Sequence, residues 1–157
     1  MFSKVLYPTD FSENALKALE YVKKLKEAGT KEIIVVHIYD KRKINSLWEI
    51  NELIDYGPPR KEEKKVLDHV LKSTYKKIKK VEKELLNIGF KVEAIVKVGD
   101  PAKEILHIAD EQNVNLIVIG EKGENALVEL FLGRTSVKVV RDAKIPVLVV
   151  KYGGDKK

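Results

Sequence analysis

The sequence predicts an α/β fold, an open five-stranded parallel sheet with helices on both faces. Two observations predict it. Short apolar runs alternate with amphipathic stretches in the order β-α-β-α-β-α-β-α-β, which is typical of parallel strands joined by right-handed helical crossovers. The stretch from Glu32 to Tyr39 is a continuous β-branched run, and such runs are typical of strands buried on both faces.

The first three elements follow from their boundary residues. An apolar run from Val5 to Tyr7 stops at Pro8, so the first strand ends there. Ser12 offers an N-cap for the first helix, and Gly29 is expected to stop that helix at its C-terminal end. The inward face of this helix has apolar residues at helical spacing, namely Ala15, Leu16, Leu19, Val22 and Leu25. The β-branched run that follows should be a central strand.

The middle of the chain contains its least regular stretch, Lys41 to Arg60. Its apolar residues predict a short amphipathic helix that Gly57-Pro58-Pro59 breaks. A lid over the site and a simple cover for the sheet are equally good interpretations. A long helix follows from Lys61 to Asn87, with an inward face predicted at Val66, Val70, Tyr75, Ile78, Val81 and Leu85. Lysines 72, 76, 79, 80 and 83 should form its solvated face.

The last four elements carry clear start and stop signals. Val92 to Val98 alternates between apolar and polar residues, which predicts a strand near an edge of the sheet. Asp100 and Pro101 should cap and open the next helix. The fourth strand, Leu116 to Ile119, ends in Gly120, and a helix around Ser136 to Arg141 then leads through Pro146 to the last strand, Val147 to Val150.

The composition limits the class of protein. With 157 residues, 44% apolar and 34% charged, the chain fits one globular domain, expected at residues 1–152 before a polar tail at 153–157. The absence of cysteine excludes disulfides, thiolate nucleophiles and sulfur-ligated metals. Since the first residues also lack a signal-peptide pattern, we expect a cytoplasmic protein. The apolar stretches fall far short of the roughly 20 residues that a bilayer crossing needs, so no membrane partner is expected.

The expected ligand site lies where the winding of the sheet reverses. In open α/β sheets a ligand binds beyond the carboxyl ends of the strands at this point, which separates strands one and four if the strand order is 3-2-1-4-5. Pro8-Thr9-Asp10 and Gly120 to Gly123 would border that crevice. Gly120-x-x-Gly123, nine further residues and Gly133 before a helix form a pattern that brings backbone N–H groups close to phosphate oxygens. The sequence therefore predicts a site for a phosphorylated nucleotide.

Three segments of the chain together resemble the universal stress protein family. They are Tyr7 to Ser12, the strand end His37-Ile38, and the glycine pattern ahead of the P-V-L-V-V strand. The resemblance covers Val5 to Lys151. It implies the strand order given above, a fold similar to that of the adenine nucleotide alpha-hydrolases, and a bound adenine nucleotide, which would be ATP, ADP or AMP.

The resemblance also implies which residues would bind the nucleotide. Ile38 would contact adenine largely through its backbone, and Asp10 would accept from the ribose or bind Mg²⁺. The resemblance further implies ligand positions at Thr9, Gly120, Gly123 and Gly133. The neighbouring residues Pro8, Ile119, Arg134 and Thr135 are expected to contribute as well. An alternative for Asp10 is that its carboxylate only caps the first helix beside Ser12.

The chain departs from the family pattern at two positions. The family has Ser or Thr after the third glycine, whereas this chain has Arg134, with hydroxyls displaced to Thr135 and Ser136. Arg134 could bond to phosphate or point outward, and Glu121 would repel phosphate unless a cation offsets it. The alternative function is therefore a nucleotide-free dimeric interaction protein whose pocket Arg134 and Glu121 have altered.

The motifs favour a regulatory or interaction module over an enzyme. The sequence contains no G-x-x-x-x-G-K-[ST] P-loop, no G-x-S-x-G elbow and no base paired with a nucleophile, so no catalytic residue is assigned and at most slow ATP hydrolysis is expected.

The three histidines form no metal-binding pair and are interpreted as structural or surface residues. The net charge of +6 arises from 30 basic residues interleaved with 24 acidic ones, which argues against a nucleic-acid partner. Because Val147 to Val150 should form an unprotected apolar edge strand, we expect a homodimer through it.

Overall fold

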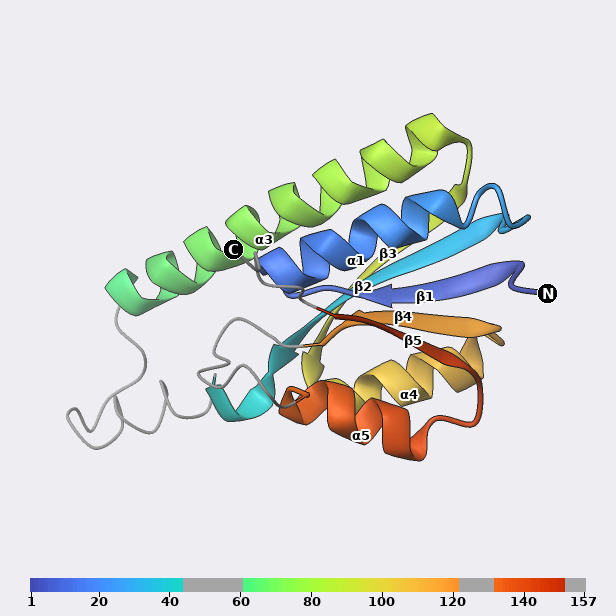
Figure 1. Cartoon of the computed structure of the whole chain (residues 1–157). Coiled ribbons are helices and arrows are strands. Elements are labelled where there is room, and N and C mark those ends of the chain that lie inside the picture. The colour runs from blue at the N-terminus through green and yellow to red at the C-terminus, as the bar shows by residue number, and fades with distance from the viewer. Residues whose placement is uncertain (44–60, 122–131, 152–157) are drawn as a thin grey trace, which may run out of the picture.

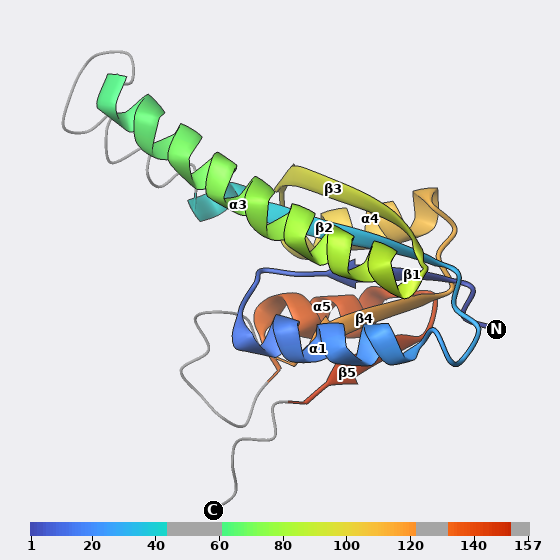
Figure 2. The same ribbon diagram turned by 90° about the horizontal axis from the view of Figure 1, so that it is seen from above.

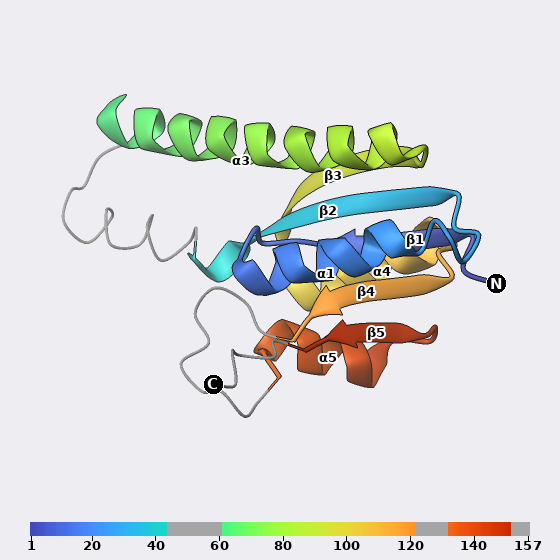
Figure 3. The same ribbon diagram turned by 45° about the horizontal axis from the view of Figure 1, so that its top comes forward.

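The computed structural model describes residues 1–43, 61–121 and 132–151 of the chain. The five strands form one parallel sheet in the order β3-β2-β1-β4-β5, so the predicted fold class and strand order are confirmed (Figure 3). The elements are β1 (Lys4–Pro8), α1 (Glu13–Lys24), β2 (Glu32–Asp40), α3 (Lys61–Ile88), β3 (Lys91–Gly99), α4 (Pro101–Glu111), β4 (Leu116–Gly120), α5 (Arg134–Asp142) and β5 (Val147–Val150).

The helices cover both faces of the sheet, α1 and α3 on one side and α4 and α5 on the other (Figure 1). Successive side chains of a strand point to opposite faces, so each strand contributes to two cores. Ile33 and Val35 of β2 pack into the core beneath α1 and α3. Ile34 and Val36 pack into the core beneath α4 and α5. Burial on both faces is the reason why β2 is a continuous apolar run instead of an alternating one.

Two helices begin at the capping residues that the sequence predicts. The hydroxyl of Ser12 accepts from the backbone N–H of Ala15 at 3.3 Å, and the carboxylate of Asp100 accepts from the N–H of Lys103 at 3.1 Å. Each bond satisfies a donor of the first turn that has no partner inside its helix. These caps thus fix where α1 begins after β1 and where α4 begins after β3.

The predicted stop of the first helix at Gly29 is wrong. α1 ends at Lys24, and the chain continues in tighter turns in which the N–H of Gly29 donates to the carbonyl of Lys26 at 3.1 Å. Gly29 has φ +90°, a conformation that side chains disfavour, so it ends the turns instead of the helix.

The predicted inward face of the long helix α3 is correct only from Ile78 onward. Ile78, Val81 and Leu85 are buried, but Val70 and Tyr75 are 44% and 58% exposed. The helix has 28 residues and is therefore about 42 Å long. Figure 2 shows its N-terminal half extending past the strands, so no sheet lies beneath that half. The five lysines predicted on the solvated face are exposed.

Two further predictions for the middle of the chain lie outside what the structure describes. They are the side chain of Val66 and the short helix predicted within Lys41 to Arg60, of which only residues 41–43 are described, as a helical turn. Among the described helices, none is both long enough and apolar enough to cross a membrane.

Candidate functional site

The winding of the sheet reverses between the neighbouring strands β1 and β4, and the pairing of these two strands stops before their carboxyl ends. β1 and β2 are paired along all of β1, as far as Pro8 opposite Val36. The ladder between β1 and β4 pairs Val5 with Leu116 and Leu6 with Ile117, although both strands continue further. The exits of β1 and β4 therefore lie next to each other without regular pairing. This is the edge of the sheet at which the sequence predicts the ligand crevice.

One side of this edge is the turn between β1 and α1. The hydroxyl of Thr9 accepts from the N–H of Phe11 at 3.1 Å, and the carboxylate of Asp10 accepts from the N–H of Ser12 at 3.0 Å. Thr9 is buried, whereas Asp10 is exposed. Asp10 thus orders the turn just before α1, as the capping alternative requires, and is exposed at this edge of the sheet.

Phe11 gives this turn a strained backbone. Its φ of +61° lies in the left-handed region, which costs a bulky residue about 1–2 kcal/mol. The ring packs against the core beneath α1 and α3, and its centroid lies 5.2 Å from that of His37. The ammonium of Lys77 lies 5.8 Å from the ring centroid. Strain that surrounding contacts hold in place is characteristic of ligand-binding turns.

The exit of β2 carries a backbone donor and a backbone acceptor that face the side of β1. The carbonyl of Val36 accepts from the N–H of Thr9 at 2.8 Å, so the polar groups of Val36 face β1. In a parallel strand these groups point to the same side at every second residue. The N–H and C=O of Ile38 therefore face that side too, beyond the end of β1 at Pro8. They form an adjacent donor and acceptor at the predicted adenine position.

His37 joins the exit of β2 to the turn. Its Nδ1 lies 2.8 Å from the carbonyl oxygen of Thr9. A carbonyl only accepts, so Nδ1 carries the proton of this bond. The ring stands edge-on to Tyr39 with centroids 4.8 Å apart, and burial lowers the pKa of His37, which favours the neutral imidazole. From the sequence, His37 was interpreted only as a structural or surface residue.

The exit of β4 is held closely against α1 and α5. A Cβ added to Gly120 would lie 2.9 Å from the backbone carbon and oxygen of Asn14, so a residue without a side chain is needed there. The carbonyl of Gly120 accepts from the hydroxyl of the buried Ser136 at 2.9 Å. Both contacts join segments far apart in the sequence, and neither Asn14 nor Ser136 was singled out from the sequence for such a contact.

The two ends of the glycine loop are tied to each other. The N–H of Gly133 donates to the carbonyl of Glu121 at 2.8 Å, so this donor closes the loop and is not open to a phosphate. Gly133 is the N-cap of α5, where no side chain of the described residues caps the helix. The first-turn N–H groups of the exposed Arg134 and the half-buried Thr135 follow it. Gly123 lies outside the described residues.

The structure brings most of the predicted ligand residues to one edge of the sheet. The exits of β1, β2 and β4 and the start of α5 meet there, and they carry Pro8, Thr9, Asp10, Ile38, Ile119, Gly120, Gly133, Arg134 and Thr135. The side chain of Ile119 packs into the core beneath α4 and α5, so what it presents at this edge is its backbone.

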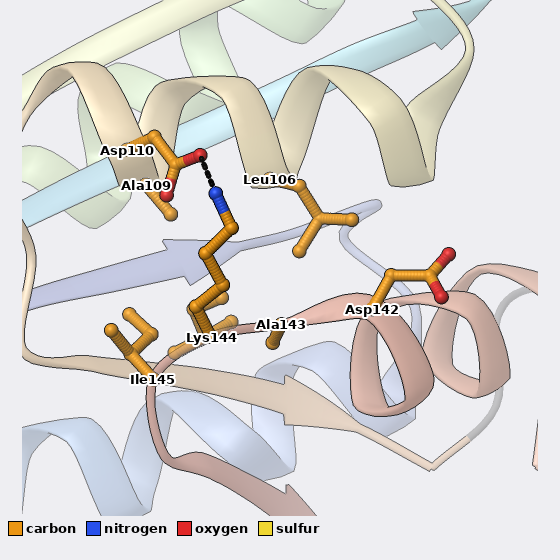
Figure 4. Close-up of a pocket in the computed structure, with 8 residues that line it drawn as sticks. Leu106, Ala109, Asp110, Asp142, Ala143, Lys144 and Ile145 are labelled. Atoms are coloured by element: carbon orange, nitrogen blue, oxygen red, sulfur yellow. Dashed lines mark ion pairs between the residues drawn. The ribbon is translucent and has the colours of Figure 1, made fainter.

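A cavity also lies at the opposite end of the sheet (Figure 4). It lies between the end of α4 and the segment after α5, near Leu106, Ala109 and Ile145, and has a volume of about 20 Å³. Such a volume holds a single water molecule, not a nucleotide. Lys144 and Asp110 form an ion pair of 3.5 Å at its rim. Within the described residues, no three histidine, aspartate or glutamate side chains are grouped so as to hold a metal ion.

Comparison with known proteins identifies the family. The model of the universal stress protein family matches residues 1–151. The universal stress protein MJ0577 of Methanocaldococcus jannaschii is 36% identical over 96% of each chain, and its solved structure matches this one with a TM-score of 0.82 over 99% of each chain.

Two more distant solved structures share the fold and contain nucleotides. A universal stress protein in complex with cAMP is 22% identical, with a TM-score of 0.63 over 96% of this chain and 97% of that one. A universal stress protein of Archaeoglobus fulgidus in complex with dAMP is 18% identical, with a TM-score of 0.60 over 96% and 98%. The match to the family model over residues 1–151, together with the identity to MJ0577, shows that this chain belongs to the universal stress protein family.

Proposed function

We propose that the chain binds an adenine nucleotide, ATP or its products ADP and AMP, at the exits of β1, β2 and β4, and acts as a regulatory or interaction module. The observation that carries the proposal is the backbone of Ile38, whose N–H and C=O face the crevice beyond the end of β1. The class of ligand is supported by two proteins of the same fold, solved with cAMP and dAMP.

The Ile38 backbone has the hydrogen-bonding pattern that adenine needs. Adenine carries a ring-nitrogen acceptor beside its amino donor, so it complements one N–H and one C=O of the same residue. Guanine carries the opposite pattern on its Watson–Crick edge. A backbone contact of this kind therefore gives preference for adenine without any special side chain.

The start of α5 supplies the groups for the phosphates. A helix N-terminus has unpaired N–H donors and a favourable dipole, and here these belong to Arg134 and Thr135. The hydroxyl of Ser136 is bonded to Gly120, so it takes no part. The guanidinium of Arg134, exposed beside these donors, replaces the missing Ser or Thr hydroxyl and offsets the carboxylate of Glu121.

Asp10 contributes the remaining contact, to the ribose or to Mg²⁺. One oxygen of its carboxylate accepts from Ser12, and a carboxylate has further acceptor positions. Mg²⁺ bound with a nucleotide is held mainly by phosphate oxygens and water, with one or two carboxylates, and Asp10 is the carboxylate of this turn.

Purified protein is expected to retain an adenine nucleotide and to bind ATP at one site per chain. Mass spectrometry of the nucleotide released on denaturation identifies what co-purifies, and calorimetric titration with ATP, with and without Mg²⁺, measures the binding. Protein that releases no adenine nucleotide and gives no heat with ATP and Mg²⁺ contradicts the proposal.

A second candidate function is a nucleotide-free interaction protein. Two observations favour it, namely Arg134 in place of a hydroxyl and the N–H of Gly133 already bonded to Glu121. Both reduce the number of groups that can hold a phosphate. Substitution of Arg134, argued in the Discussion, distinguishes this candidate from the first.

We further propose that two chains pair along β5 to form a homodimer. β5 is the last strand of the described sheet, and its residues Val147, Leu148 and Val149 are only half-buried. The carbonyl of Pro146 accepts from Ile117 of β4, and that of Val150 accepts from Glu121, the residue after β4. Because polar groups alternate in direction along a strand, those of Val149 face the open edge. An open apolar edge invites pairing with a second strand.

The Val149→Pro variant is expected to convert this dimer to a monomer. Proline removes the outward N–H of Val149 without removing a hydrogen bond to β4, and edge positions tolerate proline. Light scattering should give twice the 17.9 kDa mass of the chain for the parent and a single chain mass for the variant. A monomeric parent, or a variant that stays dimeric, contradicts pairing along β5.

A further inference from the structure

The last rung of the ladder between β1 and β2 is unusual. After the bond from the N–H of Thr9 to the carbonyl of Val36, a regular parallel ladder continues with the N–H of Ile38 donating to the carbonyl of Thr9. Within the described residues, the donor that reaches this carbonyl is instead Nδ1 of His37, at 2.8 Å. The side chain of one residue thus occupies the place of the next residue's backbone.

The contacts of His37 fix its ring in this position. The ring lies between Phe11 and Tyr39, with centroid distances of 5.2 and 4.8 Å. Phe11 in turn is held in the left-handed region and packed on the core beneath α1 and α3. Burial lowers the pKa of His37, so the ring is neutral near pH 7 and its single N–H proton lies on Nδ1.

We propose that His37 is a positioning residue of the nucleotide site: its Nδ1–H holds the carbonyl of Thr9 in place of the Ile38 N–H, and so leaves that N–H for the ring nitrogen of adenine. The proposal rests on the proposed function for its ligand, but the hydrogen-bond arrangement can be tested without one. A second effect of the bond is to hold the turn that carries Asp10 against β2.

Loss of the His37 donor changes the site in a defined way. A carbonyl in this partly buried turn needs a donor, and the donor that a regular parallel ladder supplies is the N–H of Ile38. The ladder then becomes regular, and adenine loses one of its two backbone partners. GTP does not use this N–H, because guanine has a donor where adenine has its ring acceptor, so its binding should change little.

Two variants of His37 separate this role from a merely structural one. Asparagine can place an amide N–H where Nδ1 lies, whereas glutamine places its amide near the position of Nε2. We expect His37→Asn to bind ATP within about twofold of the parent, since it keeps the bond. We expect His37→Gln to bind ATP about tenfold more weakly with little change for GTP, as loss of one hydrogen bond implies. Calorimetric titration measures both nucleotides, and thermal unfolding shows that both variants are folded.

Equal losses of ATP affinity in the two variants, or equal losses of ATP and GTP affinity in His37→Gln, would mean that His37 only supports the fold, and would overturn the proposal.

NMR of the nucleotide-free parent gives an independent test. It should find the proton of His37 on Nδ1 and rapid hydrogen exchange at the Ile38 amide, which His37→Gln should slow. A proton on Nε2, or a protected Ile38 amide in the parent, also overturns it. If the parent shows the expected NMR behaviour but binds no ATP, the proposed function fails and the role of His37 in the ladder stands.

Discussion

Replacing Gly120 by alanine is expected to lower the free energy of unfolding by about 2 kcal/mol, within the range for overpacked sites. The added Cβ would lie 2.9 Å from the backbone of Asn14, closer than carbon atoms pack. This neighbour cannot move easily. The first turn of α1 is capped by Ser12, and the carbonyl of Ala15 accepts from the hydroxyl of the fully buried Tyr7. The strain therefore has to be taken up by β4 or by a shift of the whole helix.

Urea unfolding followed by circular dichroism measures the effect, with an unchanged slope and a lower midpoint expected. Gly99→Ala is the matched control, because its Cβ would meet the side chain of Glu104 at 2.7 Å, and a side chain can rotate away. We expect a smaller loss there. Equal stabilities of Gly120→Ala and the parent would contradict the close approach of α1 to β4. The same variant should also weaken ATP binding, since Gly120 holds Ser136 at the start of α5.

The strands could be predicted from the sequence because a short unbroken apolar run indicates a strand that is buried in the sheet. β5 begins and ends where predicted, and β2 and β4 extend one residue beyond the predicted runs. The parallel sheet followed from the alternation of strands and helices, and the strand order 3-2-1-4-5 was implied by the resemblance to the universal stress protein family. The inward face of α3 was only half right. Periodicity tells which side of a helix is apolar, but Val70 lies in the half of α3 that extends past the strands, and at the next turn the buried residue is Thr74 instead of Tyr75.

The edge of the sheet that carries the candidate site was also predictable, but its internal contacts were not. The reversal of winding identifies the exits of β1 and β4 without knowledge of any side chain. The contacts of His37 with Thr9 and of Ser136 with Gly120 join residues 28 and 16 positions apart, which no local pattern records. Gly120 illustrates the difference. Its place in a glycine pattern indicated a phosphate loop, whereas the structure adds a second reason for glycine, the packing of α1.

Substitution of Arg134 is expected to have the largest effect on nucleotide binding. If its guanidinium bonds to phosphate, Arg134→Ser removes a charge-assisted contact and should weaken ATP about tenfold, and Arg134→Glu, which also adds repulsion, about 100-fold. Arg134→Lys should keep part of the affinity, because it retains the charge but not the forked geometry. AMP, with fewer phosphates, should lose less than ATP. Titrations at low and high salt give the electrostatic share of each loss.

Arg141→Ser is the matched control for charge, since it makes the same change on the same helix at its other end. Arg141 is exposed and bonds to Asp142 at 2.7 Å in the last turn of α5, far from the N-terminal donors. Its loss should leave ATP binding unchanged.

A gain of ATP binding in Arg134→Ser, in place of the expected loss, would favour the second candidate function. If the parent binds no ATP and Arg134→Ser creates binding, then Arg134 blocks a pocket that a small hydroxyl would open. The direction in which Arg134→Ser changes the affinity for ATP therefore decides whether Arg134 binds phosphate or prevents phosphate from binding.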